Sequence, residues 1–350
     1  MSDLSSQKIP VTVLTGYLGA GKTTLLNRIL SENHGKKYAV IVNEFGEIGI
    51  DNDLIIGADE EVFEMNNGCV CCTVRGDLVR ILEGLMKRKG KFDAIIVETT
   101  GLADPAPVAQ TFFVDEDVQK NARLDAVVTV ADAKWLSDRL KDAPEAKNQI
   151  AFADVIVLNK TDLVSKAELA EVEARIRGIN PYAKLHRTER CKVQLSDVLE
   201  RGAFDLDRIL EIEPEFLDAG NGHDHHHDHD HHHGHDHDHG HSHGGLKHYH
   251  DEDMQSLSLR SDKPLDPTRF MPWLQNLVAT EGQKILRSKG ILAFADDDDR
   301  YVFQGVHMML EGDHQRKWKE GETRESRVVF IGRELPQQMI RDGFESCIVT

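Results

Sequence analysis

Long apolar segments are missing from this sequence. No run of 18 or more apolar residues occurs in the 350 residues, so we expect no membrane span. The opening stretch, MSDLSSQKIP, lacks the basic start and the apolar core of a signal peptide, which predicts a cytoplasmic protein. The length predicts two domains and is ample to bury a core without disulfides.

Positive charge is also in short supply. The chain has 42 Lys and Arg against 60 Asp and Glu, which gives a net charge of −18. Such a chain repels phosphate backbones and anionic lipid, so neither duplex nucleic acid nor a membrane surface is an expected partner.

Cysteine is limited to five residues. Because cytoplasmic thiols stay reduced, clustered cysteines serve metal or redox chemistry more often than disulfides.

Short runs rich in Val and Ile recur through the first two hundred residues, with helical patterns between them. The runs are VTVLTG (11–16), YAVIVNE (38–44), AIIVETT (94–100), AVVTVAD (126–132) and DVIVLNK (154–160), and helical patterns cover 23–32 and 76–88. Apolar strands that alternate with helices predict an α/β fold, with a mainly parallel, doubly wound sheet covered on both faces.

Composition changes after residue 212. Residues 213–253 are polar and rich in Gly, His and Asp, which predicts a disordered linker between an α/β domain at 1–212 and a smaller α+β domain at 254–350. In the last part, strands are expected at MQSLSLRS (254–261), KILRSKGILAFA (284–295), RYVFQGVHMML (300–310) and SRVVFIG (326–332), and helices at 267–280 and 336–344.

The stretch GYLGAGKT (16–23) lies between a predicted strand and a predicted helix and matches the pattern G-x-x-x-x-G-K-[ST]. Glycines let backbone N–H groups approach phosphates, and the helix N-terminus favours the same anions. Lys22 should reach the β- and γ-phosphates and Thr23 should ligate Mg²⁺. An ordinary glycine-rich turn is the alternative. The predicted phosphate-binding residues are Gly16, Gly19, Ala20, Gly21, Lys22, Thr23 and Thr24.

The stretch NKTD (159–162) closes the last strong strand of the α/β domain. Asp162 can accept from the ring N–H and the amino group of guanine, a donor pair that adenine lacks. Asn159 can bond the base edge, and the Lys160 stem can cover its face. At the carboxyl end of a parallel strand, where ligands bind in such sheets, this pattern predicts guanine specificity.

Two acidic stretches lie between these motifs. VETTG (97–101) ends a strand in Glu98, which can hold Mg²⁺ through water or orient the attacking water, while Gly101 can approach the γ-phosphate through its backbone. NEFGEIGID (43–51) occupies the place of a loop that orders around the γ-phosphate in GTPases. Its acids Glu44, Glu47 and Asp51 are candidate metal contacts, with a flexible acidic surface loop as the alternative.

The stretch GCVCCT (68–73) holds Cys69, Cys71 and Cys72. In an extended segment the first two side chains face one way and the third the other, so all three thiols reach one ion only where the backbone turns. Two thiolates with a Glu or His form an easier set. Thiolates suit Zn²⁺, and mixed ligand sets also take Co²⁺ or Ni²⁺. We expect a transition-metal site here, with buried structural cysteines as the alternative. Cys191 and Cys347 are isolated and read as ordinary.

A second metal signal lies in HDHHHDHDHHHGHDHDHGHSH (223–243), which contains 13 histidines. A flexible His/Asp tract can wrap Zn²⁺, Ni²⁺ or Co²⁺ without a fixed geometry. Its internal position and its interleaved Asp, Gly and Ser argue against a purification tag. A solvated linker that buffers metal is the other alternative.

Together these motifs resemble one family, the CobW-type GTPases. The resemblance rests on GYLGAGKT, NEFGEIGID, GCVCC, VETTGLADP, NKTD, the internal His tract, and YVFQGVHMML and RVVFIG in the last domain. These proteins are metallochaperones within a larger group of P-loop GTPases that includes the urease and hydrogenase nickel chaperones. The resemblance covers nearly the whole chain except the His tract.

The resemblance implies a GTPase with Mg²⁺ in its nucleotide site, and a Cys-X-Cys-Cys metal site at Cys69, Cys71 and Cys72 with Glu47 as an extra ligand. It implies catalytic roles for Lys22, Thr23, Glu98 and Gly101, and guanine binding by Asn159, Lys160 and Asp162. We therefore expect a metal-regulated GTPase that hydrolyses GTP to GDP and times the delivery of Zn²⁺, or alternatively Co²⁺, to a client metalloprotein. The alternatives are a His-rich metal store with a vestigial GTPase and a cobalt-handling protein of cobalamin synthesis.

Overall fold

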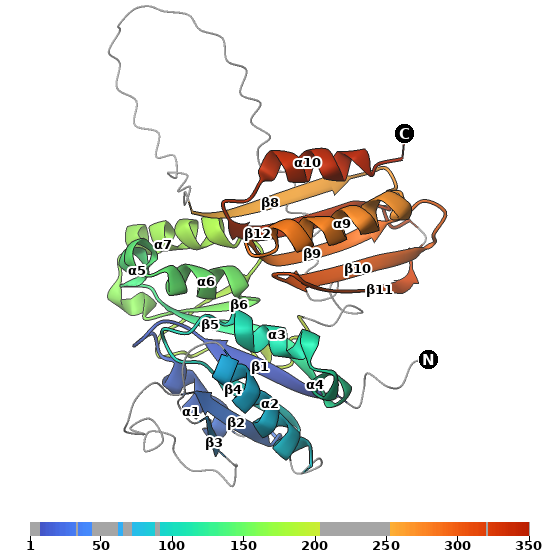
Figure 1. The fold of residues 1–350 in the computed structure, drawn as a ribbon. Helices are drawn as coiled ribbons and strands as arrows, with labels where there is room; N and C mark the ends of the chain where they lie inside the picture. Colours follow the sequence, from blue (N-terminus) through green and yellow to red (C-terminus); the bar gives the residue numbers. More distant parts are fainter. Residues whose placement is uncertain are drawn as a thin grey trace, which may run out of the picture.

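The structure, a computed structural model, describes residues 8–32, 34–43, 62–65, 72–87, 92–203, 253–319 and 321–349. The predictions for Glu44, Glu47, Asp51, Cys69, Cys71 and the histidine tract fall outside these residues. Two sheets organise the described chain, one in each half of the molecule (Figure 1). Across the described residues, no helix combines the length and the apolar character needed to cross a membrane.

The first sheet has seven strands in the order β3-β2-β4-β1-β5-β6-β7, and every neighbouring pair is parallel. The strands are β1 (Ile9–Thr15), β2 (Tyr38–Asn43), β3 (Val62–Met65), β4 (Ala94–Glu98), β5 (Ala122–Asp132), β6 (Val155–Asn159) and β7 (Lys184–Arg187). The helices between them are α1 (Lys22–Ser31), α2 (Cys72–Met86), α3 (Ala106–Val114), α4 (Glu116–Asn121), α5 (Leu136–Asp142), α6 (Pro144–Phe152) and α7 (Lys166–Ile179). The predicted parallel α/β fold is confirmed.

Both faces of this sheet are buried, which explains why its strands are continuously apolar. Val11 and Val13 of β1 pack into one cluster with α2 to α7, whereas Leu14 packs into a second cluster with α1 and with residues 191–203. On α1, the stripe Leu25, Leu26, Ile29 and Leu30 provides the buried face. The two-sided burial fixes the strand ends, and therefore the loops that follow them, on one rigid edge.

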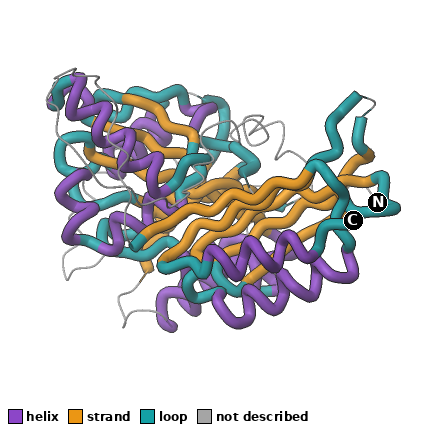
Figure 2. Tube along the Cα trace, turned by 90° about the horizontal axis from the view of Figure 1, so that it is seen from above, coloured by secondary structure: helices purple, strands orange, loops and turns teal. Residues whose placement is uncertain are grey.

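The second sheet is antiparallel, with five strands in the order β11-β10-β9-β12-β8. Its elements are β8 (Met254–Ser261), α9 (Pro267–Glu281), β9 (Ile285–Ala293), β10 (Asp299–Val306), β11 (Met309–Lys317), β12 (Ser326–Arg333) and α10 (Gln337–Ser346). Helices α9 and α10 lie along one side of the strands (Figure 2). An aromatic group around Phe270 joins both helices to the sheet. The predicted α+β domain is confirmed.

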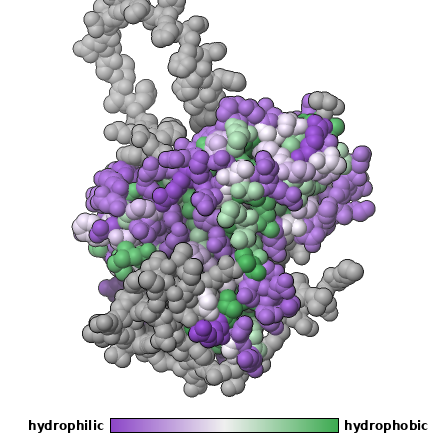
Figure 3. All heavy atoms as spheres, in the orientation of Figure 1, coloured by the Kyte–Doolittle hydropathy of each residue, from purple (hydrophilic) through white to green (hydrophobic). Residues whose placement is uncertain are grey.

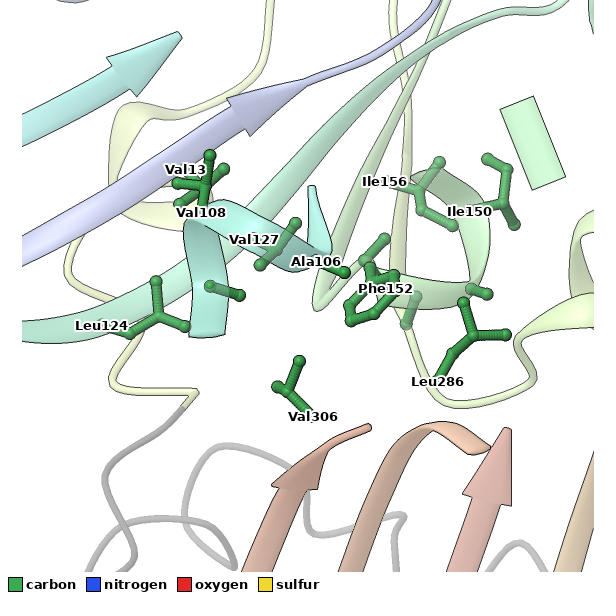
Figure 4. Packing of buried hydrophobic residues seen from close by; sticks show 14 of the residues in the cluster. Val13, Ala106, Val108, Leu124, Val127, Ile150, Phe152, Ile156, Leu286 and Val306 are labelled. Atoms are coloured by element: carbon green, nitrogen blue, oxygen red, sulfur yellow. The ribbon is translucent and has the colours of Figure 1, made fainter. Parts of the chain in front are cut away.

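The other side of the second sheet packs on the first domain, so the two domains share one core. Leu286 and Val306 belong to the same buried cluster as Phe152 and Ile150 of α6 and Ala106 of α3 (Figure 4). On the surface, apolar side chains (green) gather in a band where the second domain meets the first, within a mostly hydrophilic face (Figure 3). This shared core holds α3 and α6 between the two sheets.

Several elements differ from the sequence predictions. The stretch 300–310 was predicted as one strand, but the chain reverses at His307 (φ 52°) and Met308 to form the β10–β11 hairpin. That turn carries none of the residues that usually mark a hairpin. The short strands β3 and β7 were not predicted, because four residues carry too little periodicity. Helix α2 begins at Cys72, before the helical pattern predicted over 76–88. The domain limits at 212 and 253 stay predictions.

Candidate functional site

The loop that links β1 to α1 turns sharply at two glycines. Gly16 has φ +140°, and a Cβ there would come within 2.2 Å of the Val130 carbonyl oxygen. Gly21, at the N-cap of α1, has φ +116°, a left-handed conformation that strains any residue with a side chain. The Lys22 ammonium group donates to the Gly16 carbonyl across the loop at 2.7 Å. The Lys22 side chain therefore closes the loop from the start of α1 back to Gly16.

The motif at the end of β6 is hydrogen-bonded to this loop. The Asn159 amide donates to the Ala20 carbonyl at 2.9 Å, and its side chain is 3% exposed. Lys160, in a left-handed conformation, donates to the Gly19 carbonyl at 2.7 Å and to the Asp132 carboxylate at 2.6 Å. The base motif and the phosphate loop thus form one unit. Asp162 is exposed in the turn that follows.

A third segment completes the unit, and the sequence analysis missed it. After β7, the Cys191 N–H donates to the Asn159 side-chain oxygen at 2.8 Å, and the Thr188 hydroxyl donates to the same oxygen at 3.3 Å. Arg28 of α1 donates to the carbonyls of Cys191 and Val193. No sequence motif marked this segment. Its two consecutive left-handed residues, Arg190 and Cys191, are visible only in the structure.

Cys191 lies directly beneath the phosphate loop. Its thiol donates to the Gly21 carbonyl at 3.4 Å, and a Cβ on Gly21 would come within 3.0 Å of its sulfur. Burial raises the pKa of the Cys191 thiol to about 11, even though Arg28 and Lys160 lie near. The thiol therefore stays protonated at neutral pH and acts as packing, not as a metal-binding thiolate.

The strand beside β1 brings the predicted acidic residue to the same edge. β4 ends at Glu98, which is 7% exposed and pairs in register with Leu14 of β1. The next residue, Thr99, donates through its hydroxyl to the Thr15 hydroxyl at 2.9 Å. Gly101 lies against the phosphate loop, since a Cβ there would come within 2.6 Å of the Leu18 nitrogen. The structure thus brings Gly16, Lys22, Glu98 and Gly101 to one edge.

The donors at this edge suit a hard cation. Thr23 lies half-buried in the first turn of α1, and the buried Glu98 carboxylate lies at the end of the β4 strand. A hydroxyl and a carboxylate are oxygen ligands of the kind Mg²⁺ prefers. The residues present therefore fit the Mg²⁺ that the sequence predicts.

A cavity of about 300 Å³ opens beside the phosphate loop, on the side of β5. Tyr17, Leu18 and Gly19 of the loop line the cavity together with Trp135 and Arg139. The Arg139 guanidinium group lies 5.2 Å from the centre of the Tyr17 ring. Leu18 and Trp135 are 60% and 50% exposed, so two large apolar side chains at this cavity face solvent.

The described part of the chain contains no group of three His, Cys, Asp or Glu residues that could hold a transition metal. The predicted ligands Cys69, Cys71 and Glu47 lie outside it, and of Cys72 the structure gives only the backbone at the start of α2. Cys347 is buried in the second domain, as Cys191 is in the first. The metal site stays a prediction from sequence.

Comparison with known proteins gives a match in each domain. Residues 10–187 match the family described as CobW/HypB/UreG, nucleotide-binding domain. Residues 254–348 match the family described as cobalamin synthesis protein cobW C-terminal domain.

Individual relatives match over nearly the whole chain. The chain is 33% identical to the zinc chaperone YjiA of Escherichia coli, over 96% of this chain and 98% of that protein. It is 34% identical to the zinc-regulated GTPase metalloprotein activator 1 of Schizosaccharomyces pombe, over 95% of this chain and 84% of that protein. The crystal structure of Zn(II)-bound YjiA GTPase from E. coli superposes with a TM-score of 0.72 at 30% identity, covering 98% of this chain and 99% of that one.

Proposed function

This chain belongs to the CobW/HypB/UreG family of nucleotide-binding proteins, and from that premise we propose that it is a GTP-hydrolysing zinc metallochaperone. It hydrolyses GTP to GDP and phosphate and transfers Zn²⁺ to a client metalloprotein. The observation that carries the proposal is the single hydrogen-bonded unit in which Asn159 and Lys160 hold the phosphate loop. Similarity to a zinc chaperone and a zinc-regulated GTPase along almost the full length of the chain supports Zn²⁺ as the metal that is transferred.

The phosphates of GTP are bound at the N-terminus of α1. The helix begins at Lys22, so its first N–H groups and the positive end of its dipole face the loop. Lys22, fixed over the loop by its bond to Gly16, is placed to meet the β- and γ-phosphates. When bound, Mg²⁺ neutralises charge on these phosphates, with Thr23 and Glu98 as the residues that hold it.

Guanine is selected at the other end of the unit. Asp162 is exposed next to Lys160 and can accept hydrogen bonds from both guanine donors, whereas adenine would leave its carboxylate unpaired. Asn159 acts mainly by fixing the loop at 188–191 against Ala20, because its oxygen and its amide group are both engaged there. The base pocket is therefore set by tertiary contacts around Asn159.

The cargo is held by Cys69, Cys71 and Cys72, with Glu47 as an extra ligand. Thiolates bind Zn²⁺ tightly, and Co²⁺ is the second metal that this ligand set accommodates. In the sequence Glu47 follows β2 and the cysteines follow β3, and these two strands are neighbours at the edge of the sheet. GTP raises the affinity of this site for metal, and hydrolysis lowers it, which times release to the client complex.

Zinc titration tests the proposal. The full chain and its Cys71→Ser variant are titrated with Zn²⁺ against a competing chelator, with either GDP or a non-hydrolysable GTP analogue present. We expect one site that tightens at least tenfold with the analogue and disappears in Cys71→Ser, while the weaker sites of the histidine tract stay the same in both proteins. Equal zinc affinity with both nucleotides would contradict timed delivery and favour a metal store.

A further inference from the structure

Helix α6 holds the segment that follows β4 through two adjacent side chains. The Gln149 amide donates to the Gly101 carbonyl at 3.1 Å and to the Ala103 carbonyl at 3.2 Å. The Asn148 amide donates to the Asp104 carboxylate at 2.9 Å. We call Asn148 and Gln149 the α6 clamp. Because its partners are main-chain carbonyls and a fixed carboxylate, the clamp sets the path of residues 101–104.

Gln149 is itself held firmly. Its side chain is 1% exposed, and its main-chain carbonyl accepts a hydrogen bond from the buried Thr129 hydroxyl of β5 at 2.7 Å. A buried amide whose two N–H donors face two carbonyls has little freedom to rotate, because any other orientation would leave polar groups unpaired. Gln149 therefore links Gly101 to Thr129 of β5 by two hydrogen bonds.

The clamped segment lies against the phosphate loop. Gly101 packs against the Leu18 nitrogen of the phosphate loop and follows Glu98 by three residues. Among the described residues, no carbonyl accepts a main-chain hydrogen bond from the Gly101 N–H. That N–H is thus available to the γ-phosphate. The Gly101 N–H and the Gly101 carbonyl lie in consecutive peptide planes that meet at the Gly101 Cα, so the hydrogen bond from Gln149 to the carbonyl restricts the direction of the N–H.

We propose that Gln149 is a positioning residue for GTP hydrolysis, which fixes the main chain at Gly101 so that the Gly101 N–H is directed toward the γ-phosphate. The inference rests on the proposed GTPase function and adds a residue to it. A donor aimed at developing charge stabilises the transition state only while it stays in place, and misplacement by about 1 Å can cost about 100-fold in rate. In this proposal Gln149 acts through the Gly101 carbonyl that it holds.

The second domain reaches the same clamp. Arg333, at the end of β12, donates to the Asn148 side-chain oxygen at 2.7 Å and to the Pro144 carbonyl at 3.2 Å. These bonds fix the orientation of the Asn148 amide, whose nitrogen then faces Asp104. The Asp104 carboxylate also accepts from the Ala106 N–H at the start of α3. The second domain thereby contributes to the geometry of the segment.

The test replaces Gln149 with Met, which keeps the length of the side chain and removes both donors. Single-turnover GTP hydrolysis and the dissociation constant for GDP are measured on the full chain. We expect the hydrolysis rate to fall about 10- to 100-fold while GDP affinity changes less than about twofold, because GDP lacks the γ-phosphate. Gln304→Met is the matched control, since Gln304 is equally buried but lies in the second domain.

Two outcomes overturn the inference. An unchanged hydrolysis rate would remove Gln149 from the reaction, and an equal loss of GDP affinity would show a role in folding only. Should Gln149→Met fail to fold, Thr129→Val is used instead, because it removes the hydrogen bond from the Thr129 hydroxyl to the Gln149 carbonyl. For this variant we expect the hydrolysis rate to fall a few-fold while the GDP affinity stays nearly unchanged. Absence of hydrolysis by the unmodified protein would instead refute the proposed function itself.

Discussion

The carboxylate of Asp154 connects the two domains, and its removal should be among the most damaging single changes in the chain. Asp154 lies just before β6 and accepts hydrogen bonds from Arg287 and, at 3.2 Å, from Lys289, both on β9 of the second domain. Its other oxygen accepts from the Val127 N–H at 2.8 Å. Arg287 also donates to the Phe152 carbonyl at 2.5 Å.

The magnitude follows from burial. Arg287 and Lys289 are 4% and 7% exposed, so Asp154→Ala leaves two cations buried without their shared carboxylate. Breaking a buried ion pair from one side costs about 3–5 kcal/mol. The unpaired Val127 N–H adds about 1–3 kcal/mol. Since water can enter the space that the carboxylate leaves, we expect the free energy of unfolding to fall by about 4 kcal/mol, and by about half as much for Asp154→Asn, which keeps the volume and an acceptor.

Urea denaturation followed by tryptophan fluorescence measures this loss, because Trp318 is 8% exposed and belongs to the core that the two domains share. Asp117→Ala is the control. Asp117 pairs with Lys120 at an exposed position, so its loss should cost less than about 1 kcal/mol. A change below about 1 kcal/mol for Asp154→Ala would refute the view that the domains are locked through this ion pair.

Three further predictions concern the pH dependence of Asp154, the phosphate loop at Gly21 and base recognition by Asp162. The charges of Arg287 and Lys289 outweigh the effect of burial and lower the pKa of Asp154 below its usual 3.8, so the stability it contributes is present above about pH 3.8 and is lost as pH falls through the lower folded-state pKa. Unfolding free energies of the unmodified protein and Asp154→Asn should therefore converge only in that acid range. Gly21→Ala, which would meet Asn159 at 2.7 Å, should weaken GDP binding at least tenfold by fluorescence titration, whereas Gly35→Ala, with φ +73° but open space around it, should not. Asp162→Asn should lower GTP affinity about tenfold or more and favour a xanthine nucleotide, whose carbonyl replaces the guanine amino group; an unchanged preference in competition binding would exclude Asp162 from base recognition.

Much of the architecture could be predicted because its signals are local. The runs that became β1, β2, β4, β5 and β6 are continuously apolar, as strands buried on both faces must be. The strands that were missed, β3 and β7, are four residues long, and the β10–β11 turn at His307 and Met308 has no typical turn residue. These elements form because a neighbouring strand supplies hydrogen bonds, which a single segment of sequence does not reveal.

The candidate site divides in the same way. The phosphate loop is contained in eight consecutive residues, and its Gly and Lys positions follow from the needs of a phosphate. The contacts that hold it are long-range. Cys191 reaches Gly21 across 170 positions, and Gln149 reaches Gly101 across 48. Cys191 was expected to be ordinary, and Gln149 carried no signal at all.

The sequence by itself therefore determined the class of both domains and predicted the chemistry of the chain, through the residues of the phosphate loop, the guanine motif and the cysteine cluster. The tertiary structure decided what holds that chemistry in place. The order of strands in the sheet brings β5, β6 and the segment after β7 around the loop, and the shared core brings Arg333 and Arg287 to α6 and β6. The physical reason is that motifs depend on neighbours along the chain, whereas positioning depends on neighbours in space, which only the packed fold defines.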